Sequence, residues 1–474
     1  MTLLPGRRPG DRRVHIARVR PEVVEVAPRK PLRKPVPPAL LVMGGFAALI
    51  AIGTVLLALP ISTAAGTWQD PIIALFTATS AVCVTGLVVV DTATHWSPFG
   101  QAVIYLLVQV GGFGIAATST LLLVLAIGRR SALRDRLLVQ EAVGTPGLGG
   151  ALPFLRRLAV YTLAVQAVGV AIFFVDRLAQ GLDPLSAITW SVFHGAMAFN
   201  TAGFDLSGGF RSLTPYAEQP LVLVTTMTLV VIGGTGYAIL ADIGYKRRWR
   251  RFALETKIVV LLSASLFVGG AAFFIVGEWG NPATLGALPP ADRLVNGAFL
   301  SVTARSSGFN TVDTGGLEIH SLFVLIALMF VGGASGGTAG GIRVNTLGVL
   351  LVAVLSVGRG APSAQAFGRR IPHAVVYRAL AVALLGVLVV FAGALALEVE
   401  DELGFIRILF EIVSAFGTCG LSMGVTPELD DPGRLIVIIA MYAGRLGPLT
   451  LVLALTARAR PVAFRPAVES PRIG

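Results

Sequence analysis

The chain has 474 residues, of which 54% are hydrophobic and only 14% are charged, and its formal net charge is +12. Soluble domains carry about 25% charged residues, so the composition favours an integral membrane protein. The positive charge does not indicate nucleic-acid binding, because the basic residues lie in loops between apolar segments and form no single basic face. Two cysteines cannot build a disulfide framework, and the five histidines have no metal-ligand spacing.

Four units of the same plan follow one another: a long apolar span, a shorter apolar segment and a second long span. They are expected at residues 38–128, 155–245, 256–357 and 372–458, with tails at 1–37 and 459–474. In the first unit the three parts are Ala39–Leu59, Pro71–Thr85 and Ala102–Ile127. A long span of about 20 residues crosses a hydrocarbon core of roughly 30 Å, whereas the shorter segments can only enter and turn back. The pattern predicts an all-α integral membrane protein with eight transmembrane helices and four re-entrant pore helices around a pseudo-four-fold ion pore.

Loop charge predicts the topology. The N-terminal tail and the connections between units are rich in arginine and lysine, which places them in the cytoplasm. Loops within the units are acidic instead, and Asp91, Asp205 and Asp313 follow the shorter segments. Both termini are therefore expected in the cytoplasm. Charge alone leaves twelve full spans open, but the length of the shorter segments argues against them.

One short motif recurs roughly 110 residues apart, directly after the shorter segment of each unit. These four glycine segments are Val84-Thr85-Gly86, Thr201-Ala202-Gly203, Ser306-Ser307-Gly308 and Thr418-Cys419-Gly420. Backbone carbonyls of such segments can replace the hydration shell of a potassium ion. Glycine permits the dihedral angles that aim successive carbonyls at one axis. One such motif is usually an ordinary turn, but four in phase predict a selectivity filter on a central ion path.

Glycines recur in the second span of each unit, where helix packing is the simplest explanation for the first two clusters, Gly111-Gly112 and Gly233-Gly234. The third unit differs, because six glycines fall in ten residues. This glycine-rich loop is Gly332-Gly333-Ala334-Ser335-Gly336-Gly337-Thr338-Ala339-Gly340-Gly341. Each glycine costs about 1 kcal/mol relative to alanine in a helix, so the span is expected to break there. A flexible break under the filter predicts a gate, and a passive helix kink is the alternative.

Two arginines bear on this region. Arg445 lies within the last span, where a charge normally faces a bundle interior or a cavity. There it would repel cations and brace the glycine-rich loop through its carbonyls; the alternative is an arginine that extends to the cytoplasmic interface. Arg305 precedes the third glycine segment and is expected to brace it from behind. Asp91, Asp205 and Asp313 either concentrate cations at the mouth or are solvated loop carboxylates.

The chain resembles the Trk/Ktr/HKT superfamily of potassium transporters, and most of all the Ktr-type membrane subunit. The resemblance covers residues from about Pro38 to Ala457. It is strongest at residues 198–205, 305–313, 332–342 and 444–450. It implies potassium bound by backbone oxygens of the four glycine segments, and gating by the glycine-rich loop with Arg445.

The resemblance also implies a homodimer in the cell membrane, in contact with lipid and resting on a separate cytosolic ring subunit that binds a nucleotide. It implies no covalent cofactor in this chain, no enzymatic activity and no nucleic-acid partner. Ser306-Ser307 and Cys419 depart from the family pattern, which affects the expected selectivity more than the ion path.

Three alternatives remain. A sodium-permeable or non-selective cation channel would have the same fold. A coupled carrier would need carboxylates within the spans, and none stands out at mid-span. A membrane enzyme would need a clustered catalytic constellation, which no His, Cys or carboxylate group offers.

Overall fold

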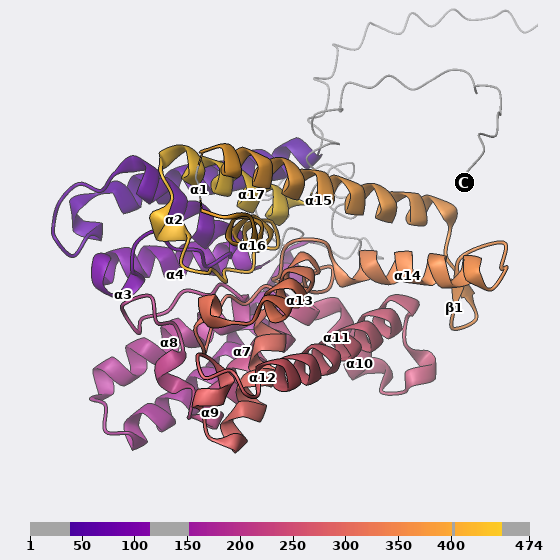
Figure 1. The fold of residues 1–474 in the computed structure, drawn as a ribbon, viewed down its shortest axis with the longest axis horizontal. Helices are drawn as coiled ribbons and strands as arrows, with labels where there is room; N and C mark the ends of the chain where they lie inside the picture. Colours follow the sequence, from indigo (N-terminus) through magenta and orange to yellow (C-terminus); the bar gives the residue numbers. More distant parts are fainter. Residues whose placement is uncertain (1–37, 114–150, 401–402, 448–474) are drawn as a thin grey trace, which may run out of the picture. The chain divides into compact units, whose positions relative to one another are not determined.

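The computed structural model describes residues 38–113, 151–400 and 403–447, and these are mostly helical (Figure 1). The helices are α1 Pro38–Ala58, α2 Pro71–Cys83, α3 Thr92–His95, α4 Pro98–Gly112, α7 Ala151–Ala179, α8 Pro184–Asn200, α9 Pro220–Thr235, α10 Tyr237–Lys246, α11 Leu254–Glu278, α12 Pro290–Thr303, α13 Ile319–Phe330, α14 Val344–Gly358, α15 His373–Glu400, α16 Phe405–Phe416 and α17 Asp431–Leu446. Six single turns of 3-10 helix are η1 Pro60–Ser62, η2 Thr214–Tyr216, η3 Trp249–Arg251, η4 Leu285–Ala287, η5 Thr314–Gly316 and η6 Thr426–Glu428. The strands β1 Gln365–Ala366 and β2 Arg369–Arg370 form an antiparallel hairpin between α14 and α15.

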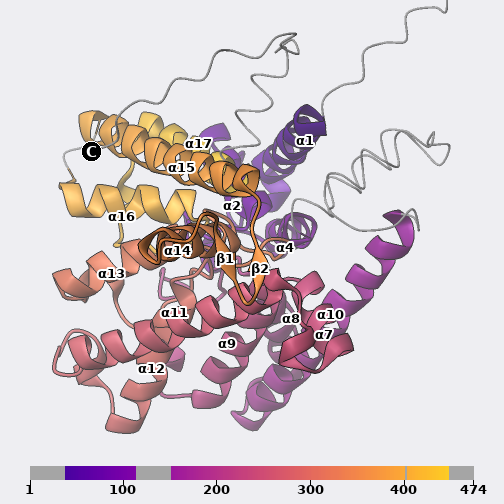
Figure 2. The same cartoon turned by 90° about the vertical axis from the view of Figure 1, so that its right-hand side faces the viewer.

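The main helices form four groups, each with a first helix, a short helix and a third helix. The groups are α1, α2 and α4; α7, α8 and α9; α11, α12 and α13; and α15, α16 and α17. Within each group the first helix packs against the other two. The helices of one group lie together in both views (Figures 1 and 2).

The groups are joined in a closed ring. The third helix of each group packs against the short helix of the next: α4 on α8, α9 on α12, α13 on α16, and α17 back on α2. The short helices therefore lie on the inside of the arrangement, where most residues of α2, α8 and α16 and the carboxyl-terminal part of α12 are buried. This ring brings the carboxyl ends of four short helices, far apart in sequence, to one place.

The short helix α16 begins at Phe405, but the other three, α2, α8 and α12, begin at proline. In α2 and α8 an aspartate precedes it: Asp70 accepts a hydrogen bond from the Ile72 amide at 2.8 Å, and Asp183 accepts one from the Ser186 amide at 2.9 Å. Proline at the first helical position and aspartate at the cap satisfy the free amides of a helix start. These helices have 12 to 17 residues, fewer than a membrane span needs.

The expectation of a long, continuous second span is wrong in the second group, whereas the break expected in the third group is present. The helix α9 stops at Thr235 and α10 continues at an angle of 93°, with Gly236 between them at φ +82°. The helix α13 stops at Phe330, and α14 begins only at Val344. In the first and fourth groups α4 ends at Gly112 and α17 at Leu446, and the predicted continuations after them lie outside the described residues.

Among the described residues, fewer than eight helices are long and apolar enough to cross a membrane. In the described part of the chain Leu155–Ala179, Leu254–Glu278 and His373–Val399 are long and apolar enough to cross a membrane, and the bent pair α9–α10 makes a fourth if it counts as one span. The tails 1–37 and 459–474 and the connection after the first group fall outside the described residues.

The glycine clusters at these breaks also allow very close packing. A Cβ on Gly111, Gly233 or Gly444 would overlap a carbonyl oxygen of the short helix in the same group, respectively that of Val82, Phe199 and Phe416. Each of these carbonyls belongs to the residue four positions before the glycine of its glycine segment. The third helices thus rest on the exposed carbonyl ends of the short helices, which only glycine allows. Helix packing therefore explains the first two glycine clusters, as expected. The same clusters also mark the ends of α4 and α9.

Replacing Gly444 with alanine is expected to lower the free energy of unfolding by about 1–3 kcal/mol, the usual range for overpacking. The matched control is Gly269→Ala in α11, where a Cβ would meet nothing within 4 Å. Thermal unfolding of both purified variants measures the difference. Equal midpoints for the two variants would contradict the close packing.

Candidate functional site

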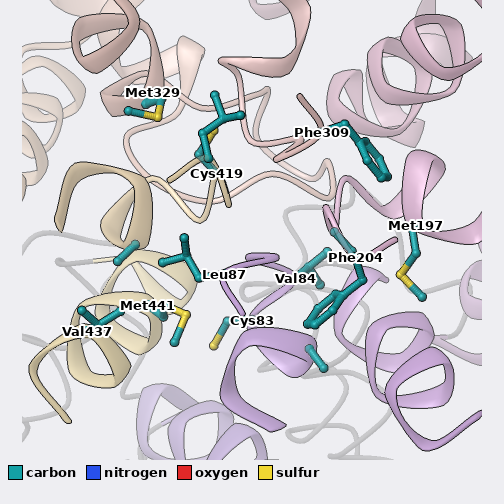
Figure 3. Packing of buried hydrophobic residues seen from close by; sticks show 14 of the residues in the cluster. Cys83, Val84, Leu87, Met197, Phe204, Phe309, Met329, Cys419, Val437 and Met441 are labelled. Atoms are coloured by element: carbon teal, nitrogen blue, oxygen red, sulfur yellow. The ribbon is translucent and has the colours of Figure 1, made fainter. Parts of the chain in front are cut away.

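The four glycine segments meet at the centre of the ring of helices. A Cβ on Gly203 would lie 3.1 Å from the carbonyl oxygen of Ser307, and one on Gly308 would lie 2.6 Å from that of Cys419. In the same way Gly86 faces the carbonyl of Ala202, and Gly420 faces that of Thr85. Each glycine therefore faces the middle carbonyl of the next segment, and the fourth closes on the first. Buried side chains of the segments and of the residues next to them, among them Val84, Leu87, Phe204, Phe309 and Cys419, surround this centre (Figure 3).

The backbone has the same unusual conformation in all four segments. The first residues, Val84, Thr201, Ser306 and Thr418, have φ values of 57°, 58°, 66° and 45°, and the glycines have φ values between 70° and 94°. The left-handed region is strained for any residue with a side chain, and most of all for β-branched Val and Thr. Strain that recurs at four equivalent positions indicates a functional constraint on the backbone.

Hydrogen bonds from the segment amides to the preceding short helices stabilise this conformation. The amides of Thr85, Ala202 and Cys419 each donate to a carbonyl five residues earlier, at 2.8, 2.9 and 2.8 Å. The third segment differs, because the Ser307 amide donates to Thr303 at 3.1 Å, four residues earlier.

Two serines missed by the sequence analysis complete this support. The hydroxyl of Ser80 accepts from the Gly86 amide at 3.0 Å, and that of Ser414 accepts from the Gly420 amide at 3.1 Å. Both serines stand six residues before the glycine of their segment, a spacing that was available in the sequence. Because these amides are occupied, the segments can offer their carbonyl oxygens to a cation at the centre.

The glycine-rich loop spans the gap between α13 and α14 and is held at both ends. The Gly332 amide donates to the Ile342 carbonyl at 2.8 Å, which brings the two ends of the loop together. The Ala334 amide donates to Gly234 at 2.9 Å, and the Gly341 amide donates to Gly444 at 3.2 Å. Both acceptors lie in glycine clusters of other groups, so the loop is seated on α9 and α17. Ser335 and Gly336 are exposed, whereas the other eight residues of the loop are buried.

Arg445 is fully buried and lies beside this loop. Its guanidinium donates to the carbonyl of Thr338 in the loop and to that of Gly111 in α4. No carboxylate pairs with it among the described residues. The side chain therefore faces the interior of the bundle, and the alternative of extension to the interface does not hold.

Two further arginines bond to the same loop. Arg305 donates to the Gly332 carbonyl at 3.3 Å and lies 4.4 Å from the ring centre of Phe267. Arg343, which the sequence analysis did not single out, donates to the Ala339 carbonyl. The sequence could have indicated this arginine, because it lies two residues after the last glycine of the loop. Three positive charges thus contact loop carbonyls within an apolar bundle.

The acidic candidates separate into two kinds. Asp91 caps α3 through the Thr94 amide at 3.2 Å, and Asp313 caps η5 through the Gly315 amide at 3.0 Å. Asp205 is two residues past Gly203, half-buried, and accepts from the Ser207 amide at 2.8 Å. Of the three, Asp205 is the carboxylate placed directly at a glycine segment.

Two buried carboxylates, Glu278 and Glu411, were missed, and Glu411 is the one beside a glycine segment. Glu411 in α16 is fully buried and accepts hydrogen bonds from the hydroxyls of Ser422, at 2.8 Å, and Thr426. Both partners belong to the connection that follows the fourth glycine segment. Glu411 therefore holds that connection against the short helix.

Comparison with known proteins agrees with this architecture. Residues 46–460 match the TrkH family, which is described as cation transport proteins. The chain is 40% identical to the Ktr system potassium uptake protein B of Bacillus subtilis over 419 residues, or 88% of this chain and 92% of the relative. It is 34% identical to the potassium/sodium uptake protein NtpJ of Enterococcus hirae, over 91% of this chain and 95% of that one.

The crystal structure of the potassium transporter TrkH from Vibrio parahaemolyticus has the same fold. It superposes with a TM-score of 0.68 over 90% of this chain and 86% of that one, at 17% identity. The family consists of transport proteins and not of enzymes, which confirms the expectation that this chain has no enzymatic activity. The apolar helices described above fit a multi-pass membrane protein. The predicted resemblance is also confirmed: the chain belongs to the TrkH/Ktr family of cation transport proteins.

Proposed function

We propose that this chain mediates potassium uptake across the cell membrane, along a path lined by backbone oxygens of the four glycine segments. The closed ring of glycines and carbonyls carries the proposal, because a ring of backbone oxygens is what a dehydrated potassium ion requires. Relatives named as potassium uptake proteins support it. Ser307 and Cys419 contribute to the ring through carbonyls, so their departure from the family pattern leaves the ring intact.

The four groups of helices correspond, in this proposal, to four repeats around a pseudo-four-fold axis, at residues 38–128, 155–245, 256–357 and 372–458. The short helices are re-entrant pore helices. Their carboxyl ends carry partial negative charge and point at the glycine segments, which favours a cation there.

The charges of the connections support an orientation. Arg247, Arg248, Arg250 and Arg251 lie between α10 and α11, and Arg369 and Arg370 lie in the hairpin before α15. These basic segments adjoin the starts of two long apolar helices, so this end faces the cytoplasm. Both termini are then cytoplasmic as well, and residues 1–37 and 459–474 are cytoplasmic tails.

The glycine-rich loop is the gate in this proposal, and Arg445 holds it in the closed position. The loop lies beside the glycine segments, and its contacts to α9 and α17 include hydrogen bonds between backbone groups that can be exchanged for water. Three guanidinium groups around the loop add an electrostatic barrier to cations.

The proposed assembly is a homodimer with a separate cytosolic ring subunit that binds the nucleotide. Potassium is the cargo, and no covalent cofactor is required. Lipid surrounds the exposed apolar faces of α7, α11 and α15, where Val168, Val268 and Leu384 are more than half exposed. The ring subunit is proposed from the relatives whose names refer to a Ktr system.

A sodium-permeable channel on the same fold is the alternative, and one relative is named for both potassium and sodium. Side chains of the glycine segments do not decide between the two, because the ring is made by the backbone. The ratio of potassium flux to sodium flux distinguishes the two functions.

The first experiment measures cation flux into liposomes that contain the purified chain. Potassium and rubidium flux is expected to exceed sodium flux at least tenfold, and Gly308→Ser is expected to abolish this preference, because a side chain there meets the Cys419 carbonyl at a φ of +76°. Gly269→Ser, in open space, is the control. Equal potassium and sodium flux in the wild type would support the alternative channel, and unaltered selectivity in Gly308→Ser would contradict the filter.

Deletion of Ala334–Ala339 tests the gate. Removing this segment also removes the loop carbonyls that accept from Arg445 and Arg343, so potassium flux without any partner protein is expected to rise several-fold. The same liposome assay measures it. Flux equal to that of the intact chain would show that the loop only packs the helices.

A change in external pH tests whether the charge of Asp205 concentrates cations at the entrance of the ion path. Burial raises the pKa of Asp205 to about 6; the neighbouring Asp91 also raises it, while the Ser207 hydrogen bond and Arg211 lower it. The carboxylate is therefore charged at pH 7.5 and mostly neutral at pH 5, where it no longer concentrates cations. The apparent KM for potassium is expected to rise several-fold between these pH values.

Asp205→Asn is expected to remove this pH dependence and to keep the higher KM throughout. Asp183→Asn is the control, because hydrogen bonding to the Ser186 amide lowers the pKa of that exposed carboxylate and asparagine still caps α8. A pH profile in Asp205→Asn that matches the wild type would exclude this carboxylate.

A further inference from the structure

Thr338, in the glycine-rich loop, connects three parts of the molecule at once. Its amide donates to the Gly233 carbonyl in α9 at 3.2 Å, and its carbonyl accepts from the Arg445 guanidinium in α17. Its hydroxyl lies 3.0 Å from the hydroxyl of Thr201, the first residue of the second glycine segment. All three polar groups of this buried residue are thus engaged.

The direction of the hydroxyl contact follows from the neighbours. The Thr201 hydroxyl donates to the Asn200 carbonyl at 2.6 Å, so its single proton is already used. The proton between the two threonines therefore comes from Thr338. The loop donates a hydrogen bond, and the glycine segment accepts it.

This bond acts on a strained residue. Thr201 has a φ of 58° and is fully buried, and its carbonyl directly precedes Ala202, whose carbonyl faces Gly86 in the ring. Without Thr338 the buried Thr201 oxygen would keep its bond to Asn200 but would accept no hydrogen bond, which costs free energy, so the Thr338 donor stabilises this conformation. The next residue back, Asn200, is held too, because its side-chain amide donates to Gln109 at 3.0 Å.

The other three segments have no equivalent bond in the described structure. Val84 has no hydroxyl, and the Ser306 hydroxyl donates to the Gly417 carbonyl at 2.7 Å, in the adjacent group. The Thr418 hydroxyl has no hydrogen-bond partner in the described part of the chain, although Gly340 packs against it. The second segment is therefore the one that the loop contacts by a side-chain hydrogen bond.

We propose that Thr338 is a positioning residue that determines selectivity. Its hydroxyl holds the second glycine segment in the potassium-binding geometry while the glycine-rich loop is bonded to α9 and α17. The inference rests on the proposed function and deepens it. Movement of the loop then removes the donor from Thr201, so the gate position and the ion preference of the filter are coupled through one hydrogen bond.

The test measures equilibrium binding of potassium and sodium to the purified full-length chain by isothermal titration calorimetry, which needs neither an open gate nor a partner. Thr338→Val removes the hydroxyl but retains the shape, the amide and the carbonyl, so the loop keeps its contacts to Gly233 and Arg445. The ratio of potassium to sodium affinity is expected to fall about three- to tenfold, as the loss of one hydrogen bond predicts. Thr338→Ser is expected to retain the wild-type ratio.

Thr228→Val is the matched control, because that exposed hydroxyl in α9 bonds only to the Val224 carbonyl of its own helix. A double-mutant cycle with Thr201→Val separates a specific bond from general damage. If Thr338 acts through Thr201, the double variant has the same affinity ratio as either single variant. Additive losses would overturn the inference, as would an unchanged ratio in Thr338→Val.

The outcomes also separate this inference from the proposed function. A wild-type chain with no preference for potassium overturns the proposed function, before any variant is compared. A wild-type preference that persists in Thr338→Val overturns only the role of the hydroxyl. If Thr338→Val does not fold, Thr338→Ala removes the same hydroxyl with a smaller side chain and is measured in its place.

Discussion

The structure depends on one steric constraint: four backbone segments approach one another so closely that no side chain fits between them. Gly86, Gly203, Gly308 and Gly420 each face a carbonyl of the next segment; a Cβ would overlap that carbonyl at Gly86, Gly308 and Gly420 and would make a tight contact of 3.1 Å at Gly203. The same constraint applies between the third helices and the short helices, where Gly111, Gly233 and Gly444 lie against the carbonyl ends of the short helices. Close approach at the axis thus sets the position of the short helices, and through them the packing of the third helices.

The breaks in the third helices follow from these glycines. A residue that permits close packing also weakens the helix that contains it, and α9 and α13 stop at their clusters. The amides and carbonyls released there need partners within an apolar bundle. In the third group the glycine-rich loop supplies them, since its amides bond to Gly233, Gly234 and Gly444.

The buried arginines also satisfy backbone groups that the broken helices leave unpaired. Arg305, Arg343 and Arg445 each donate to a carbonyl of the loop that no helix satisfies. Backbone carbonyls stabilise these charges without a carboxylate partner in the described part of the chain. This explains how a chain that is only 14% charged places three guanidinium groups beside one loop.

Periodicity, apolar length and the recurrence of glycine were sufficient to predict the short helices, the four glycine segments and the interior position of Arg445. They express local chemistry: proline begins a helix, glycine permits a positive φ, and a charge within an apolar span needs a polar interior. The second span of the second group was predicted too long, because hydropathy does not register a bend at Gly236, whereas the six glycines of the third group did predict its break. Ser80, Ser414 and Arg343 were missed although their spacing from the glycines was visible in the sequence, whereas Glu411 was missed because its partners lie in a connection whose placement no local pattern gives.

The sequence by itself determined which residues are able to adopt the filter conformation, since backbone freedom and side-chain size are properties of each residue. Only the tertiary structure decided which carbonyl each glycine faces and which segment the loop contacts. The contact between Thr338 and Thr201 joins residues 137 positions apart, and that between Arg445 and Gly111 joins residues 334 positions apart. Such pairings depend on how the helices close into a ring, and that closure is a property of the whole chain.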